Sequence, residues 1–352
     1  MTEIDQNNFI DSDNYNYYNA YSYDISVIIP IYKAELFIEN CARSLFGQSL
    51  LNIEFIFIDD CSPDNSISIL EKVIEDYPNR KKDTIIIRNI NNLGPSISRL
   101  KGLEKSRGRY VIFCDSDDWI EKDMYSILLH MAKKNDADFV WCDFIDEFKG
   151  YKRYRKEAEI EDNKILISSI LTGKCHGSQC NKLVKRELLL KHKHLMEIKL
   201  SMWEDLLLTI FILEDSNRIC YVNKALYHYN QENIQSLLTQ LTTNKIEDRV
   251  KVCNKLNELF VTNNQEFIFK DQLYQRMLLA KMEYITEYNY LNIKRWQELW
   301  PESNIAKDNV NISYIKHIIL NFACKENFFM VRILVVIKYF GQKIKIFFNK
   351  LL

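Results

Sequence analysis

Five short apolar runs mark the first 142 residues of the chain, and each is rich in β-branched and aromatic side chains. They lie at residues 27–32, 54–58, 84–88, 110–114 and 138–142. Their hydrophobicity is nearly continuous rather than alternating, which is typical of strands that are buried on both faces of a parallel sheet. The pattern therefore predicts five buried strands.

Segments with helical spacing separate these runs. They lie at about 35–49, 63–77, 95–107 and 121–134. Pro63 and Pro95 stand at the expected first turns, where proline suits a helix start. The repeated strand–helix order predicts an α/β fold with a mostly parallel sheet, right-handed crossovers and helices on both faces. Ligands of such sheets bind beyond the carboxyl ends of the strands.

The pattern also divides the chain into three regions. Residues 1–24 form a polar tract rich in Asn and Tyr without periodicity, and we expect a mobile tail there. Residues 25–240 hold the α/β unit. Residues 241–352 read as a helical C-terminal region, with helices expected near 246–260, 268–289, 311–323 and 327–350.

Three carboxylates are packed into four residues directly after the fourth apolar run. They are Asp115, Asp117 and Asp118. Like charges this close repel one another, so the cluster is costly unless a cation neutralises it. Oxygen ligands on an Asp-x-Asp spacing suit a hard divalent ion such as Mg²⁺ or Mn²⁺. The alternative is a solvated turn whose acids cap the next helix near Glu121.

Two other strand ends carry polar chemistry on the same expected sheet edge. Pro30 and Tyr32 end the first strand, and Asp60 follows the second. The pair Asp59 and Asp60 could hydrogen-bond a base or ribose edge, or only cap the helix that starts at Pro63. Dinucleotide-binding motifs are excluded, since the eight glycines form neither G-x-G-x-x-G nor a P-loop.

A turn follows the third strand at Asn92 and Gly94, just before the helix that begins near Pro95. Exposed amides at a helix N-terminus can bind an anion. An ordinary loop cap is the alternative.

A further acidic pair, Glu204 and Asp205, follows Trp203 and precedes an apolar helical run. A carboxylate beside an aromatic ring can have its pKa tuned for general-base work, although Asp205 could instead be a helix N-cap. Downstream, His228 could reach a diphosphate or could be an ordinary packed histidine.

Composition narrows the function classes. The formal net charge of -1 disfavours nucleic acid as a partner, because no basic field attracts phosphate backbones. Nine scattered cysteines without a C-x-x-C pair indicate free thiols in a reducing compartment. No signal peptide is visible and no apolar run approaches the roughly 20 residues of a membrane span. We therefore expect a cytoplasmic protein.

The C-terminal stretch 325–352 mixes large apolar residues with basic ones. Its six basic residues stand against one acid, Glu326: Lys325, Arg332, Lys338, Lys343, Lys345 and Lys350. A basic amphipathic helix can lie in a membrane interface, where anionic lipid attracts it. The alternative is a helix packed on its own domain.

Six segments in a fixed order together resemble the family-2 glycosyltransferases, which have the nucleotide-diphospho-sugar transferase (GT-A) fold. The resemblance covers roughly residues 25–235. The segments are 26–33, 57–66, 92–104 with Asn92, Gly94 and Arg99, 108–119 with the Asp-x-Asp motif, 181–183, and 204–205.

The resemblance implies roles for individual residues. Asp205 matches the catalytic base, and Asp117 with Asp115 matches the ligands of Mn²⁺ or Mg²⁺. The donor nucleotide would be bound by Pro30, Tyr32, Asp60, Asn92, Gly94, Arg99, Asp115 and Ser116. Diphosphate or acceptor contacts would come from Lys182, Glu204 and His228.

Two departures from the family pattern affect this assignment. Relatives often carry Tyr-x-Tyr followed by Arg, whereas this chain has Tyr227, His228, Tyr229 and then Asn230. The cation that closes over the diphosphate is therefore open between His228 and Lys182. Cys180 stands where relatives often have a large aromatic residue.

The resemblance implies an inverting transfer of a sugar from a nucleotide-diphospho-sugar, commonly a UDP-sugar, to a hydroxyl of a polysaccharide or glycolipid precursor. The reaction would run in the cytoplasm or at the inner face of the membrane. A membrane contact through residues 325–352 and a homo-oligomer stay open. One alternative is a non-catalytic sugar-nucleotide-binding protein. A haloacid-dehalogenase-like phosphatase is the other, but that fold needs the Asp-x-Asp motif on its first strand.

Overall fold

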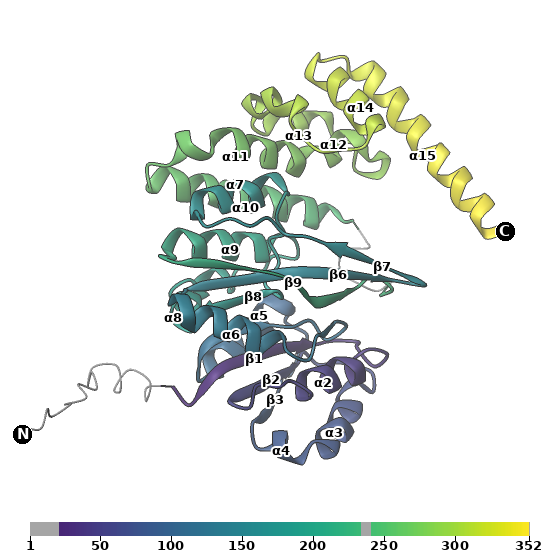
Figure 1. Cartoon of the computed structure of the whole chain (residues 1–352). Helices are drawn as coiled ribbons and strands as arrows, with labels where there is room; N and C mark the ends of the chain where they lie inside the picture. The colour runs from purple at the N-terminus through teal and green to yellow at the C-terminus, as the bar shows by residue number, and fades with distance from the viewer. Residues whose placement is uncertain (1–20, 234–240, 352) are drawn as a thin grey trace, which may run out of the picture.

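The computed structural model describes residues 21–233 and 241–351, and Figure 1 shows an α/β body with helices stacked beyond it. Nine strands of the described chain form one sheet in the order β3-β2-β1-β4-β8-β6-β9-β5, with β7 paired to β6. The strands are β1 (Tyr23–Ile31), β2 (Ile53–Asp59), β3 (Thr84–Arg88), β4 (Gly108–Phe113), β5 (Trp119–Ile120), β6 (Phe139–Phe148), β7 (Tyr151–Arg155), β8 (Lys182–Lys185) and β9 (Ile219–Asn230).

The first four predicted strands are confirmed as the parallel half of this sheet, in which β2 pairs with β1 and β3, and β1 with β4. The fifth apolar run lies in β6, but β6 is not the neighbour of β4. The short strand β8 pairs antiparallel with both and lies between them. The α/β prediction with a mostly parallel sheet holds, and the second half of the sheet is mixed.

The helices before the C-terminal region are α2 (Ile38–Phe46), α3 (Ser66–Asp76), α4 (Pro78–Lys81), α5 (Pro95–Lys105), α6 (Met124–Asn135), α7 (Asn163–Thr172), α8 (Arg186–Lys191), η1 (Lys193–Leu195) and α9 (Glu204–Asp215). The four helices expected between the first strands are present as α2, α3, α5 and α6. Pro95 begins α5 as predicted, whereas Pro63 lies in the turn before α3 and not at its start. Helix α7 was not predicted, although Asp162 caps its N-terminus and Gly173, with a φ of 78°, ends it.

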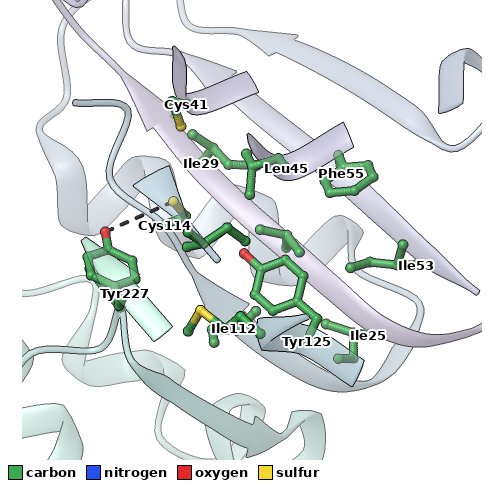
Figure 2. Close-up of a cluster of buried hydrophobic side chains, with 14 of the residues drawn as sticks. Ile25, Ile29, Cys41, Leu45, Ile53, Phe55, Ile112, Cys114, Tyr125 and Tyr227 are labelled. Atoms are coloured by element: carbon green, nitrogen blue, oxygen red, sulfur yellow. Dashed lines mark hydrogen bonds between the residues drawn. The ribbon is translucent and has the colours of Figure 1, made fainter. Parts of the chain in front are cut away.

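Both faces of the parallel strands are buried, which is why their sequences are continuously apolar. Val27 and Ile29 of β1 pack with α2, α3 and α6 in one core, while Ile28 packs with α5 on the other side. Figure 2 shows the first of these cores, in which Tyr125 of α6 lies beside residues of β1, β2 and β4.

The C-terminal region consists of α10 (Thr243–Thr262), α11 (Glu266–Lys281), α12 (Glu283–Thr286), η3 (Tyr288–Tyr290), α13 (Ile293–Glu298), η4 (Pro301–Asp308), α14 (Tyr314–Cys324) and α15 (Phe328–Leu351). Helices α10 and α11 share the core of α7 and α9, through residues such as Phe260 and Met277. The later helices form a separate cluster around Trp296 and Ile319. Residues on both sides of position 240 therefore contribute to one core, and the division of the chain at residue 240 stays a prediction.

The predicted polar tail, 1–24, lies mostly outside the described residues, and Tyr23 and Asp24 already belong to β1. Across residues 21–233 and 241–351, no helix has both the length and the apolarity needed to cross a membrane.

Candidate active site

A cavity of about 1580 Å³ opens at the carboxyl ends of the parallel strands. Its walls come from the segments after β1, β2 and β4, from the start of α9, from β9, and from α10 and α11. Eleven of the residues predicted from the sequence line it: Pro30, Tyr32, Asp60, Asn92, Gly94, Arg99, Asp115, Ser116, Asp117, Glu204 and Asp205. The topology of the sheet thus gathers residues that are up to 175 positions apart, from Pro30 to Asp205.

One wall of the cavity is the loop between β3 and α5, which Asp60 holds in place. The Asp60 carboxylate accepts hydrogen bonds from the backbone N–H groups of Leu93 and Gly94, both at 2.8 Å, and from the Asn89 side chain at 2.8 Å. Gly94 has φ 87° and ψ 163°, a conformation that residues with a Cβ rarely adopt. Asp60 therefore positions the turn beside the cavity instead of capping α3.

A single buried guanidinium joins the two acidic motifs. Arg99 of α5 donates from Nη2 to Asp115 Oδ1 at 2.7 Å and from Nη1 to Asp205 Oδ1 at 3.0 Å. Glu204 Oε1 lies 3.8 Å from the same Nη1. The Asp115 carboxylate also accepts from the Cys180 thiol at 3.2 Å. The residue after the fourth strand and the start of α9 are therefore neighbours in space.

The backbone turn before α9 directs its acids to this point. Trp203 precedes the helix with a φ of 63°, which is unusual for a bulky residue and places Glu204 and Asp205 in the first turn. Burial, followed by the negative charge of Asp205, raises the pKa of Glu204 to about 7. Burial also raises the pKa of Asp205, and the positive charge of Arg99 opposes that rise.

Replacing Arg99 with Met is expected to move the acid limb of the activity profile to higher pH. Two cations, Arg99 and Lys182, lower the pKa of Asp205. The negative charge of Asp115 raises the pKa of Asp205. Glu204 also lies beside Asp205, near the same Arg99 guanidinium. Loss of the guanidinium therefore raises the pKa of Asp205, and any activity that needs the ionised Asp205 carboxylate is lost sooner as pH falls. The measurement is kcat/KM against pH. Arg99→Lys keeps a positive charge, so the acid limb of its pH profile should lie close to that of the unmodified protein. Identical acid limbs in Arg99→Met and the unmodified protein would show that Arg99 does not control the ionisation of a carboxylate that activity needs.

Asp117 is the second carboxylate of the Asp-x-Asp motif, and it faces the cavity. Its Oδ2 accepts a hydrogen bond from the Asn233 side chain at 2.8 Å. Burial and the nearby Asp115 charge raise its pKa. In the described ranges, no three His, Cys, Asp or Glu side chains are grouped to hold a metal ion. One or two carboxylates that leave positions for phosphate oxygens are a donor set that Mg²⁺ accepts, so Asp115 and Asp117 fit such an ion.

Asp118 has a different environment from its neighbours. Its carboxylate accepts from the Tyr227 hydroxyl at 2.5 Å and from the Asn230 backbone N–H at 2.8 Å. The Tyr227 hydroxyl also contacts Cys114, as the dashed line in Figure 2 shows. Asp118 therefore connects β9 to the turn that follows β4, and the alternative that Asp118 caps the next helix is wrong, since the N-cap residue of α6 is Asp123. Since the motif follows β4 and not the first strand, the phosphatase alternative is excluded as well.

The two cations proposed for the diphosphate do not line the cavity. His228 is buried between Glu147 and Glu121, at 2.6 and 2.9 Å, and stacks on Trp119. In a strand, successive side chains point to opposite faces, so Tyr227 and Tyr229 face the cavity and His228 does not. Lys182 is also buried, and its ammonium donates to the backbone oxygen of His176 at 2.9 Å. The structure therefore does not support either residue as the diphosphate cation.

Arg155 of β7 lines the cavity and was missed by the sequence analysis. Its guanidinium carbon lies 4.3 Å from the centre of the Phe144 ring and 5.6 Å from that of Tyr229. Its Nη2 pairs with Asp146 at 2.8 Å, and its Nε has no hydrogen-bond partner among the described residues. No local motif marks Arg155; only the pairing of β7 with β6 brings it to the cavity.

The far wall was also missed, because it comes from the C-terminal helices and their neighbours. It includes Lys199, Lys251 and Arg276, and it also includes Trp203, which the sequence had already marked as the aromatic neighbour of the acidic pair. Two arginines stack on the ring of Trp203. The guanidinium carbon of Arg276 lies 4.8 Å from the ring centre, and the guanidinium carbon of Arg249 lies 5.3 Å from it. These stacked groups fix the wall of the cavity beside Asp205.

Part of the chain matches a known protein family. Residues 26–192 match the model described as Glycosyl transferase family 2. The chain is similar to the uncharacterized glycosyltransferase EpsJ of Bacillus subtilis (strain 168), with 29% identity over 221 residues, 60% of this chain and 62% of EpsJ. It is also similar to the cholesterol galactosyltransferase of Borreliella burgdorferi, with 27% identity over 293 residues, 79% of this chain and 78% of that protein. The chain thus spans less than two thirds of the length of EpsJ.

Among solved structures, the chain is similar to S. aureus TarS 1-349 in complex with UDP-GlcNAc. The TM-score is 0.61 at 18% identity, and the match covers 90% of this chain and 92% of that one. At this identity the likeness shows the fold alone. The chain therefore has the fold of the GT-A glycosyltransferases, and the family model places residues 26–192 in glycosyltransferase family 2.

Proposed function

We propose that this protein is a metal-dependent, inverting glycosyltransferase that moves a sugar from a UDP-sugar to a hydroxyl of a polysaccharide or glycolipid precursor. The observation that carries the proposal is the bridge of Arg99 between Asp115 and Asp205. Arg99 holds Asp115, a carboxylate suited to the diphosphate of the donor, next to Asp205, a carboxylate suited to act as a base. A buried base beside a leaving-group site is the arrangement that a single displacement needs.

Asp205 would take the proton from the acceptor hydroxyl. The acceptor oxygen then bonds to the anomeric carbon from the side opposite the diphosphate, and the bond from that carbon to the diphosphate oxygen breaks. The leaving diphosphate keeps the electron pair, and the configuration of the sugar inverts. The raised pKa of Asp205 makes it a stronger proton acceptor than an exposed Asp.

Asp115 and Asp117 would hold Mn²⁺ or Mg²⁺ at the donor diphosphate. When bound, such an ion neutralises charge that develops on the leaving group. The donor base and ribose would lie along Pro30, Tyr32 and Asp60, since these residues share one wall of the cavity. The UDP-GlcNAc complex of TarS, which has the same fold, supports a uridine donor.

The acceptor would enter along the wall formed by Trp203 and the helices α10 and α11. The cavity volume of about 1580 Å³ exceeds the roughly 1,000 Å³ of large small-molecule sites, so it has room beyond a donor. Glu204 would contact the acceptor beside Asp205. The sterol acceptor in the name of one relative is consistent with a lipid-borne acceptor here. Nine free thiols support a reducing, cytoplasmic location.

Release of nucleoside diphosphate by purified protein tests this proposal. The assay uses UDP-glucose, UDP-galactose, UDP-GlcNAc and GDP-mannose, each with Mn²⁺, with Mg²⁺ and with EDTA. We expect metal-dependent release from one of the UDP-sugars. Tight donor binding without release from any donor, also in the presence of candidate acceptor glycans, would favour the non-catalytic binding protein instead.

Arg155 is our candidate for the cation over the diphosphate, and Arg155→Met should weaken UDP binding by about tenfold to 100-fold. A charged hydrogen bond to phosphate contributes about 1.5–3 kcal/mol, which sets this range. Titration calorimetry with UDP in the presence of Mn²⁺ measures it. Arg153→Met is the matched control, because Arg153 also pairs with Asp146 but does not line the cavity. Equal affinities of the two variants for UDP would show that Arg155 does not bind the diphosphate.

A further inference from the structure

Helix α15 is attached to the protein along one side only. Val331 and Val335 are fully buried in the cluster of C-terminal helices. Lys338 on the same side donates to Glu287 at 2.6 Å and to the Thr286 carbonyl at 2.8 Å, and Tyr339 stacks on Tyr288. In Figure 1 the helix, drawn in yellow, continues past the other helices on the side where the β6–β7 hairpin ends.

The opposite side of α15 exposes large apolar side chains. They are Phe329, Ile333, Val336, Ile337, Phe340 and Ile344, and Phe329, at 73%, is the most exposed. Their spacing of three and four residues, with Val336 and Ile337 adjacent, places them on one face of a helix. A contiguous apolar face of this kind on a protein surface marks an interaction site. We call these six residues the apolar stripe.

Basic groups border the apolar stripe, and acids are absent from it. Arg332 and Lys343 are exposed and lie eleven residues apart, about three helical turns, so they lie on the same edge of the stripe. Residues 327–352 of the sequence contain no Asp or Glu. The helix thus combines an apolar face with a basic edge at Arg332 and Lys343.

We propose that α15 docks the protein onto an anionic lipid bilayer and lies in the plane of the membrane interface. Apolar side chains would enter the acyl boundary while Arg332 and Lys343 contact acidic headgroups. A second copy of the chain is a poorer occupant, because α15 of that copy would bring the same basic edge and no acid. This docking would not depend on which sugar the active site transfers.

The membrane proposal is tested by flotation of the full-length protein with vesicles. One set contains phosphatidylcholine alone and the other also contains about 30% phosphatidylglycerol. We expect flotation with the anionic vesicles and its loss in about 1 M salt, where charge attraction is screened. The double variant Ile337→Glu with Phe340→Glu should bind these vesicles at least about tenfold more weakly, because it places charges in the apolar stripe.

Two further variants keep this test decisive. Phe267→Glu with Ile305→Glu is the matched control, since these side chains are 81% and 68% exposed elsewhere on the surface, and it should float like the unmodified protein. Arg332→Glu with Lys343→Glu leaves the packed side of α15 intact and should also lose anionic binding. Equal flotation of the stripe variant and the control, or no flotation of the unmodified protein, would overturn the proposal. A dimer in analytical ultracentrifugation that only the stripe variant dissociates, with no vesicle binding, would assign the stripe to self-association instead.

Discussion

Asp205→Asn is expected to lower kcat by about three orders of magnitude and to leave donor affinity within roughly twofold. General-base catalysis contributes about 10²–10⁴ in rate, and an amide cannot accept the proton. The Asn oxygen can still accept from Arg99, and the Gln179 side chain bonds the backbone oxygen of residue 205, so the local structure should persist. Single-turnover transfer and calorimetric binding of UDP measure the two effects separately.

Glu204→Gln is the control for Asp205→Asn, because it removes a neighbouring buried carboxylate. Its effect on kcat should be much smaller, since Asp205 keeps its contact with Arg99. Unchanged transfer by Asp205→Asn would refute the proposed mechanism while leaving the family assignment intact. An equal loss in both variants would point to a shared electrostatic role rather than a base at Asp205.

Asp117→Ala should remove most of the metal dependence of UDP binding. With Mn²⁺ present, we expect UDP affinity to fall on the order of 100-fold, because the protein supplies only one or two carboxylates to the ion and the loss of one leaves few ligands. With EDTA, the variant and the unmodified protein should bind UDP about equally. Calorimetry under both conditions measures the difference.

Asp118→Asn provides the control for Asp117→Ala. Asp118 is bonded to Tyr227 and Asn230, so its substitution should lower the melting temperature and leave the Mn²⁺ dependence of binding unchanged. A metal-dependent gain in affinity that survives in Asp117→Ala would show that the ion is held elsewhere. The comparison thus separates a metal ligand from a carboxylate that only connects two strands.

The parallel half of the fold could be predicted because its signal is local. Strand β2 is buried on both faces, so its successive residues are all apolar: Phe55, Ile56, Phe57 and Ile58. Such a run is visible in the sequence without knowledge of the neighbouring elements. The second half gave weaker signals. β8 contains two lysines in four residues, and β9 mixes exposed and buried positions, so neither reads as a continuous apolar run.

The candidate site shows the same division. Carboxylates that follow apolar strands are visible in the sequence, and the topology of the sheet brings them to one cavity. His228 and Lys182 look suitable because both can carry positive charge, but strand alternation turns His228 away and burial encloses Lys182. Arg155 has no motif, and strand pairing alone brings it to the cavity.

By itself, the sequence determined the α/β class, the strand-end acids and the family resemblance, because these depend on local hydrophobicity and on motifs of a few residues. Only the tertiary structure decided that Arg99 joins Asp115 to Asp205, that Asp118 fastens β9, and that α10 and α11 close the far wall of the cavity. Those contacts link residues far apart in the chain. Their geometry depends on how helices and strands pack, and no local pattern records it.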